Sequence, residues 1–284
     1  MLSKIKNLSN LLLTLFLILV ITSCSNSRKK NFVEAERILK LGKYRDLLTF
    51  LKTEKDSTDN EFYYLRGVAE YKLNLLKNSL SDLTIYLKGT PDDTLGLEYR
   101  ANVLIELDSL NMAVVDMNKL IALNKYKAEV YNKRGLIYQN QNKWDLAFDD
   151  FNNSIKCDSS LFKPYCNLGL LYEDKKDYKK SIIFYTKAIE KNRYESTIYF
   201  NRGVAYLYLK KSSLSVADFN TAIKINPKDG SYYLNRGIAY FYLNNFQNAR
   251  EDWNKAYLFG ITEAKDYLDK YCKPNSDENK SFNM

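Results

Sequence analysis

An eight-residue motif returns along this chain at a fixed interval of 34 residues. It reads Tyr-Phe-Asn-Arg-Gly-Val-Ala-Tyr at Tyr199–Tyr206 and Tyr-Leu-Asn-Arg-Gly-Ile-Ala-Tyr at Tyr233–Tyr240. Weaker copies stand at the same interval upstream, at Tyr165–Tyr172, Tyr131–Tyr138, Leu97–Leu104 and Tyr63–Glu70. A constant period over six copies predicts a repeat array, in which each unit buries its apolar face against its neighbours.

Each copy is followed by the same order of small and large side chains. Twelve residues after the glycine place comes a small residue, and four residues later a large one. The small residues are Ser79, Ala113, Ala147, Ser181, Ser215 and Ala249, and the large ones are Leu83, Met117, Phe151, Tyr185, Phe219 and Trp253. Polar turns such as Asn142-Lys143 separate the two runs, which indicates two helices joined tightly. We expect the small residues to let the backbones approach, and the large ones to cover the edge of that contact.

An arginine and an aspartate also recur together, sixteen residues apart. The pairs are Arg66 with Asp82, Arg100 with Asp116, Arg134 with Asp150, Arg202 with Asp218 and Arg236 with Asp252. The fourth copy changes both places at once, to Leu168 and Phe184. This joint change predicts that the two places touch across the hairpin and that the charges are structural. An exposed pair of this kind contributes about 0.2–1 kcal/mol.

The pattern resembles the tetratricopeptide repeat family, which has the same period and the same order of aromatic, glycine, alanine and proline places. The resemblance covers six repeats, 60–93, 94–127, 128–161, 162–195, 196–229 and 230–263. The chain departs from the family at Ala101, and only Pro91 and Pro227 keep the proline. The resemblance implies an all-α solenoid of stacked antiparallel helix pairs in a right-handed superhelix. It also implies a concave face, lined by the first helices, that holds a peptide or a partner's helix.

The array is predicted to have a cap at each end. Residues 32–59 look like a degenerate helical hairpin without the glycine signature, as terminal repeats often are. Residues 264–272 predict a capping helix, since Ala264, Tyr267, Leu268 and Tyr271 form one apolar stripe. The polar residues 273–284 are expected to be a disordered tail.

Residues 1–23 have the pattern of a secretory signal peptide. Two lysines precede an apolar run over 8–21, shorter than the roughly 20 residues that span a bilayer. The run ends in Ile-Thr-Ser-Cys, which resembles a bacterial lipobox and implies cleavage before Cys24 and acylation of that cysteine. We therefore expect a lipid-anchored tether over 24–31 and an exported protein at the outer membrane, facing the periplasm. An uncleaved signal anchor, or a secreted protein cut at another site, is the alternative.

Composition argues against most catalytic and metal chemistry. The 284 residues include no histidine, the commonest general base and metal ligand. No glycine-rich phosphate loop is present, so we expect no cofactor, no metal and no enzyme activity. The net charge of +9 is spread along the helices, whereas nucleic-acid binding needs a clustered basic surface. Cys157 and Cys166 flank one turn, and the sequence leaves two alternatives for them: a disulfide bond, or two small buried apolar side chains.

One strip of residues on the first helices is not used by the repeat pattern. Lys133, Asn167, Asn201 and Asn235 occupy the same place in four successive repeats. Asparagine is a mediocre helix former, yet a side-chain amide both donates and accepts hydrogen bonds. Stacking would align these residues as a ladder, and in related arrays such asparagines bind the backbone of an extended ligand. The alternative is that they bond a neighbouring repeat or tolerate a wet inner surface.

Extra aromatic residues accompany this strip. Phe200, Tyr208 and Tyr242 exceed what the repeat pattern requires, and we expect some of them to anchor a partner in the same groove. The function predicted is a non-catalytic scaffold of the cell envelope that binds a peptide segment or a partner protein. The alternative is an accessory protein for glycan binding or outer-membrane assembly. An aromatic platform beside carboxylates would favour sugar, and an amide ladder would favour peptide.

Overall fold

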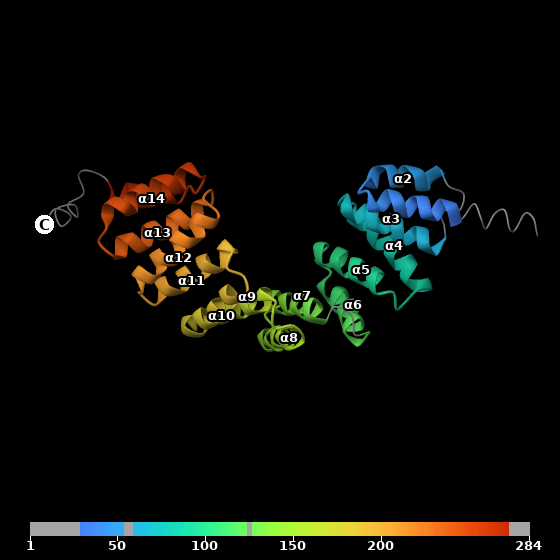
Figure 1. The fold of residues 1–284 in the computed structure, drawn as a ribbon, viewed down its shortest axis with the longest axis horizontal. Helices are drawn as coiled ribbons and strands as arrows, with labels where there is room; N and C mark the ends of the chain where they lie inside the picture. Colours follow the sequence, from blue (N-terminus) through green and yellow to red (C-terminus); the bar gives the residue numbers. More distant parts are fainter. Residues whose placement is uncertain (1–28, 54–58, 124–126, 273–284) are drawn as a thin grey trace, which may run out of the picture. The chain divides into compact units, whose positions relative to one another are not determined.

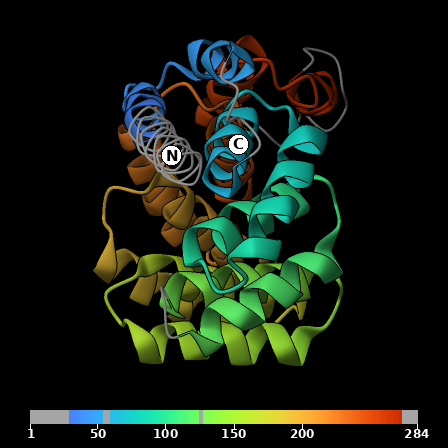
Figure 2. The same cartoon turned by 90° about the vertical axis from the view of Figure 1, so that its right-hand side faces the viewer.

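The computed structural model describes residues 29–53, 59–123 and 127–272, and within these ranges it contains helices and no strand. The signal segment, Cys24, most of the tether and the predicted tail lie outside the described residues. The chain divides into two compact units, Met1–Tyr126 and Lys127–Met284. Within each unit, antiparallel helices follow one another in chain order (Figures 1 and 2).

The first unit opens with a helix over 29–40. It continues with α2 (Tyr44–Thr53), α3 (Asn60–Lys72), α4 (Leu76–Gly89), α5 (Thr94–Glu106) and α6 (Leu110–Ala122). The opening helix and α2 lie where the sequence predicts the N-terminal hairpin. Their apolar residues Ala35, Leu47 and Leu51 form one buried cluster with Phe62 and Leu65 of α3. The N-terminal hairpin therefore buries apolar side chains of α3, the first helix of the first full repeat.

The second unit holds the remaining helix pairs and the predicted cap. Its helices are α7 (Lys127–Asn140), α8 (Trp144–Cys157), α9 (Phe162–Asp174), α10 (Tyr178–Lys191), α11 (Ser196–Tyr208), α12 (Ser212–Ile225), α13 (Gly230–Tyr242), α14 (Phe246–Leu258) and α15 (Ala264–Tyr271). The predicted stripe of α15 packs on Trp253 of α14, whose side chain is buried. Within the ranges given above, every helix is too short or too polar to cross a bilayer.

The turn inside each pair has the same backbone shape. Six residues spaced by 34 have φ between 56° and 60°: Asn74, Asp108, Asn142, Lys176, Lys210 and Asn244. This left-handed conformation lets the next N–H return to the helix end, as Leu75 does to the Glu70 carbonyl at 2.8 Å. Asparagine and aspartate tolerate it, whereas the lysines carry the usual steric cost of a side chain there.

The glycine of the motif is required by the large residue on the partner helix. A Cβ on Gly203 would lie 2.7 Å from Cε1 of Phe219, and one on Gly169 would lie 2.5 Å from Cε1 of Tyr185. The large residue therefore sits directly on the glycine and does not merely cover an edge, as the sequence pattern suggested. Ser79 does make the predicted close approach, because its hydroxyl donates to the Gly67 carbonyl at 2.7 Å.

The predicted arginine–aspartate contacts are confirmed in all five hairpins. Each arginine uses Nε and Nη2 to donate to both oxygens of its aspartate. The N···O distances are 2.6–2.8 Å in the four pairs after Arg66–Asp82. The aspartates are buried, so these pairs are not the exposed kind considered above. Leu168 and Phe184 take their place in the fourth hairpin as part of one apolar cluster.

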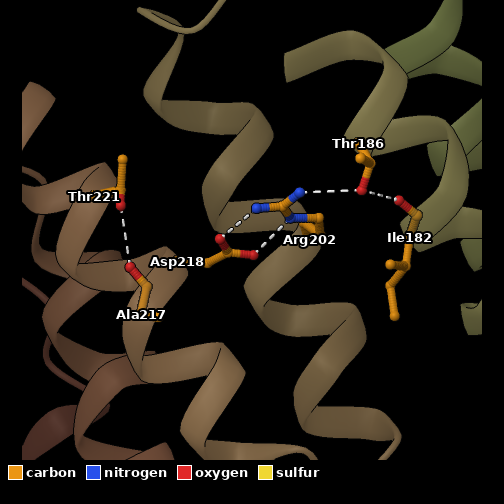
Figure 3. A network of polar contacts seen from close by, with 6 residues as sticks. All are labelled: Ile182, Thr186, Arg202, Ala217, Asp218 and Thr221. Carbon is orange, nitrogen blue, oxygen red and sulfur yellow. Dashed lines mark hydrogen bonds and ion pairs between the residues drawn. The ribbon is translucent and has the colours of Figure 1, made fainter. Parts of the chain in front are cut away.

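Two of these arginines, Arg202 and Arg236, also join neighbouring hairpins, which the pairing pattern did not predict. Figure 3 shows Arg202 holding Asp218 with two nitrogens while its third, Nη1, donates to Thr186 Oγ1 on α10 at 3.0 Å. Arg236 makes the equivalent contact with Asn220 on α12, at 2.6 Å. Each of these guanidinium groups therefore spans three helices.

The cysteines settle the open choice at the turn between α8 and α9. Cys157, Cys166 and Cys272 are all free thiols, so no disulfide joins the first two. Cys166 is mostly enclosed, and its burial raises the pKa of the thiol to about 12. Cys157 is exposed, so the second alternative, two buried apolar side chains, is wrong for this cysteine.

Candidate peptide-binding face

The predicted partner-binding residues lie on the first helices of the second unit. Lys133 is on α7, Asn167 on α9, Asn201 on α11 and Asn235 on α13. These helices follow one another as neighbours within the unit. The structure therefore places the four residues in order along one row of helices, and the question is which of their polar groups face a ligand.

The amides of this row differ in what they bind. Asn167 donates from Nδ2 to Asn132 Oδ1 on α7 at 2.8 Å, which is the bond to a neighbouring repeat considered above as the alternative. Asn235 donates to the Ser231 carbonyl within its own helix at 3.0 Å. Lys133 also interacts within the chain. Asn201 alone of the three asparagines makes no polar contact with the described residues. Asn167 and Asn235 each use a donor within the chain, whereas Asn201 keeps its whole amide free of polar contacts with the described residues, and contact of this row with a ligand stays a prediction.

Phe200 belongs to the packing between hairpins. Its ring lies 5.9 Å from the Phe219 ring and 5.1 Å from the Tyr232 ring, centroid to centroid. Tyr232 is buried on α13, and its hydroxyl bonds Ser196 at 3.0 Å. Phe200 therefore joins α11, α12 and α13, and only part of its ring is open to solvent.

Tyr208 and Tyr242 meet at a hollow on the surface. They line a cavity of about 440 Å³ together with Leu207, Lys210 and Ser212, and we call these five residues the tyrosine pocket. Tyr208 is 62% exposed and Tyr242 is 66% exposed. The ring of Tyr178 stacks on the ring of Tyr208: the two planes are parallel within 6°, and the ring centroids are 4.5 Å apart. Stacking fixes Tyr208 in place, so the pocket wall is held before any ligand arrives.

The pocket occupies a place that polar pairs occupy elsewhere in the array. The last turn of one first helix meets the last turn of the next through residues 35 apart: Tyr71 donates to Glu106 at 2.9 Å, and Gln139 donates to Asp174 at 3.0 Å. At the equivalent place between α11 and α13 stand Leu207 and Tyr242, which both line the pocket. Replacing a polar pair by Leu207 and Tyr242 leaves an exposed apolar surface at this junction.

The charge at the pocket is positive. Lys210 lines it, is exposed, and has no ion-pair partner among the described residues. None of the lining residues is a carboxylate. The aromatic platform therefore lacks the carboxylates that sugar binding would favour. The combination of apolar walls with a cation suits an apolar side chain next to an acidic group.

Part of this site could have been found from the sequence. Five residues after the glycine place, the repeats read Lys72, Glu106, Asn140 and Asp174, and then change to Tyr208 and Tyr242. That change marks the junction. The contribution of Tyr178, Lys210 and Ser212 was missed, because these residues come from the turn and from the second helices.

Among the described residues, no group of three or more acidic, cysteine or histidine side chains could hold a metal ion. The buried aspartates of the hairpins each accept hydrogen bonds from an arginine. The acids therefore serve the hairpins, in accord with the prediction that the charges are structural.

Comparison with known proteins finds one family model that matches two repeats and solved structures with the same fold. The tetratricopeptide repeat family model matches residues 162–193 and 196–229. No curated protein matches the chain. A tetratricopeptide repeat protein from Parabacteroides merdae is 20% identical over 85% of this chain and 97% of its own, with a TM-score of 0.64. The C-terminal part of a repeat protein from Cytophaga hutchinsonii is 18% identical over 84% of this chain and 99% of its own, with a TM-score of 0.68.

A third solved structure, YrrB, is described as a repeat protein with an unusual peptide-binding site. It is 19% identical over 66% of this chain and 97% of its own, with a TM-score of 0.54. At these identities the likeness concerns the fold. Together with the 34-residue period and the paired helices, the matches show that the chain has the fold of tetratricopeptide repeat proteins, and that residues 162–193 and 196–229 fit the repeat model itself.

Proposed function

We propose that this protein is a non-catalytic scaffold that captures a peptide segment of a partner protein on the first helices of its second unit. The observation that carries the proposal is the tyrosine pocket, where two exposed tyrosines and an unpaired lysine surround a cavity of about 440 Å³. The segment it fits has a large apolar side chain beside a carboxylate. YrrB, a protein of this fold, has a described peptide-binding site, which supports the general mode.

The neighbouring amide gives the segment a second contact. Asn201 lies on α11, the helix that ends at Tyr208, and its amide has no partner among the described residues. A side-chain amide can hold both the N–H and the C=O of an extended peptide. The apolar anchor would then supply most of the affinity, and Asn201 would align the backbone.

Selection from a displayed random-peptide library on the full-length protein tests this function. We expect enriched peptides to share an aromatic or aliphatic residue adjacent to Asp, Glu or the terminal carboxylate. Tyr242→Ala should weaken binding of the selected peptide about tenfold or more, because large aromatic anchors dominate such interfaces. Tyr194→Ala is the matched control, since Tyr194 is 77% exposed on a turn outside the pocket. Equal affinity of both variants would contradict the proposal, and enrichment of oligosaccharides instead of peptides on a glycan array would favour the glycan alternative.

We also propose that the scaffold works in the bacterial cell envelope, anchored by a lipid on Cys24. The support is the sequence of the first 24 residues, with its two lysines, its short apolar run and its terminal Ile-Thr-Ser-Cys. Metabolic labelling with a fatty-acid analogue should mark the wild type and leave Cys24→Ala unmarked. Equal labelling of the two would rule out this anchor. The anchor holds the protein at the outer membrane facing the periplasm, which fractionation of the labelled cells checks.

A further inference from the structure

One side of the opening helix, residues 29–40, carries cations and exposed aliphatic side chains. Ala35, Phe32 and Leu39, on the other side of this helix, pack in the core of the N-terminal hairpin. Leu41 extends the exposed side into the turn, and Val33 and Leu41 are each 57% exposed. The exposed residues follow one another at helical spacing, and we call them the N-terminal face: Lys29, Lys30, Val33, Arg37, Lys40 and Leu41.

The hairpin that carries this face is much more basic than the rest of its unit. Residues 29–53 contain seven lysines and arginines against three carboxylates, whereas residues 59–123 contain six against ten. The capping helix α15, at the other end of the array, is balanced, with two lysines and two aspartates. The positive charge of the first unit is therefore concentrated on its N-terminal hairpin.

The two glutamates of the opening helix do not cancel this charge. Arg37 Nη2 donates to Glu34 Oε1 at 2.6 Å, and Lys40 Nζ lies 3.7 Å from Glu36 Oε2. All four side chains are exposed to water, so each pair is weakly coupled and both cations can turn to another anion. Lys29 and Lys30 form no ion pair with any described residue.

The chain reaches this face five residues after Cys24. An extended backbone spans at most about 3.6 Å per residue, so the Cα atoms of Cys24 and Lys29 are separated by no more than roughly 18 Å. The acyl group proposed above for Cys24 would therefore hold the N-terminal face beside the phospholipid headgroups.

We propose that the N-terminal face binds the surface of an anionic phospholipid bilayer, with its cations on the phosphates and its two aliphatic side chains in the interface. Cations interleaved with exposed aliphatic residues on one side of a helix are what interfacial binding requires. An acidic polymer would engage the cations but would leave Val33 and Leu41 in water. The inference rests on the lipid anchor proposed above for the placement of the face, and it adds a contact that orients the first unit on the membrane.

Sedimentation with lipid vesicles tests the face. The chain from Ser25 onwards is used, because the apolar run over 8–21 or an acyl group would bind any membrane; it keeps every residue that the structure describes. At low salt we expect it to bind vesicles of equal parts phosphatidylglycerol and phosphatidylcholine at least tenfold more tightly than vesicles of phosphatidylcholine alone. Binding should be lost at about 1 M salt, where the Debye length falls to about 3 Å.

Variants of matched charge show whether this face makes the contact. Changing its four cations to glutamine should lower the affinity for the anionic vesicles tenfold or more, because each lysine or arginine at such a surface strengthens binding about fivefold. The control changes four exposed lysines of the second unit in the same way and should alter the affinity little: Lys175, Lys176, Lys179 and Lys180. Val33→Ser with Leu41→Ser keeps the charge and should weaken binding several-fold, since apolar contact with lipid is lost. Circular dichroism checks that each variant is folded.

Equal losses in the two four-charge variants, or equal binding to charged and uncharged vesicles, would overturn the proposal. Unchanged binding of the double serine variant would do the same, because the face would then not enter the interface. The anchor is tested separately by metabolic labelling. Since the chain used with vesicles lacks Cys24, failed labelling and failed vesicle binding are distinct results.

Discussion

Gly203 and Phe219 are held closer than two ordinary side chains allow. A methyl group on Gly203 would meet the fully buried Phe219 ring at 2.7 Å, and the ring cannot retreat because it is enclosed on all sides. The second repeat solves the same problem differently. There Ala101 takes the glycine place and the large residue is Met117, both buried. A flexible thioether can bend around a methyl group where a flat ring cannot.

This contact predicts the cost of a larger residue at the glycine place. Gly203→Leu should lower the free energy of unfolding by about 1–3 kcal/mol, because overpacking forces Phe219 and its neighbours to shift. Urea denaturation followed by circular dichroism measures the change. Ser213→Leu, an exposed position on α12, is the control and should have little effect. A neutral Gly203→Leu would show that the hairpin can open without cost.

Glu70 predicts how stability depends on pH. Its pKa is about 7 in the folded chain, against 4.5 for the unfolded one. The folded state therefore retains a proton that the unfolded state has lost, so this contribution to stability is complete below pH 4.5 and disappears as pH rises through 7. The free energy of unfolding of the wild type relative to that of Glu70→Gln, measured by urea denaturation from pH 5 to pH 8, should therefore fall as the pH rises. Parallel stability curves for the two proteins would contradict it.

At the scale of the hairpin, the fourth repeat supplies a natural replacement for the ion pair. Asp218→Phe alone should destabilise the chain by about 3 kcal/mol or more, because it leaves the Arg202 guanidinium partly buried without its carboxylate. Adding Arg202→Leu recreates the Leu168–Phe184 pair and should recover most of that loss. Thermal or urea unfolding of both single variants and the double variant gives the coupling energy directly. Purely additive effects would show that the two positions do not act as a unit.

The elements were predictable where the 34-residue period repeats a position six times. The paired helices and the arginine–aspartate contacts follow from such comparisons, and the apolar stripe of α15 follows from the helical spacing of its own residues. Contacts at other spacings were not predictable in this way. Asn167 bonds Asn132 at a separation of 35, and Tyr178 stacks on Tyr208 at a separation of 30. Neither pair of residues recurs at the 34-residue interval, so comparison of the repeats does not show which residues are partners.

At the scale of the whole molecule, the array needs a cover at its C-terminal end. The Trp253 ring is 1% exposed because Tyr267 and Tyr271 of α15 lie 5.2 and 6.0 Å from it. Deleting residues 264–284 should expose the ring, shift its fluorescence to longer wavelength and lower stability by about 2 kcal/mol or more. Deleting only 273–284 is the control and should leave the emission unchanged. An unshifted spectrum in the larger deletion would show that α15 is dispensable.

The arginine that joins neighbouring hairpins has a consequence for how such a chain changes its length. Thr186 and Asn220 stand 34 residues apart and offer an oxygen to Arg202 and Arg236 respectively. Removing one whole period, residues 196–229, would place Arg236 beside Thr186, whose Oγ1 is the acceptor at the equivalent position. The arginine can donate to either Thr186 or Asn220 at this position. Unequal recombination between repeats can therefore add or delete one repeat and still leave the arginine with an acceptor on the preceding hairpin.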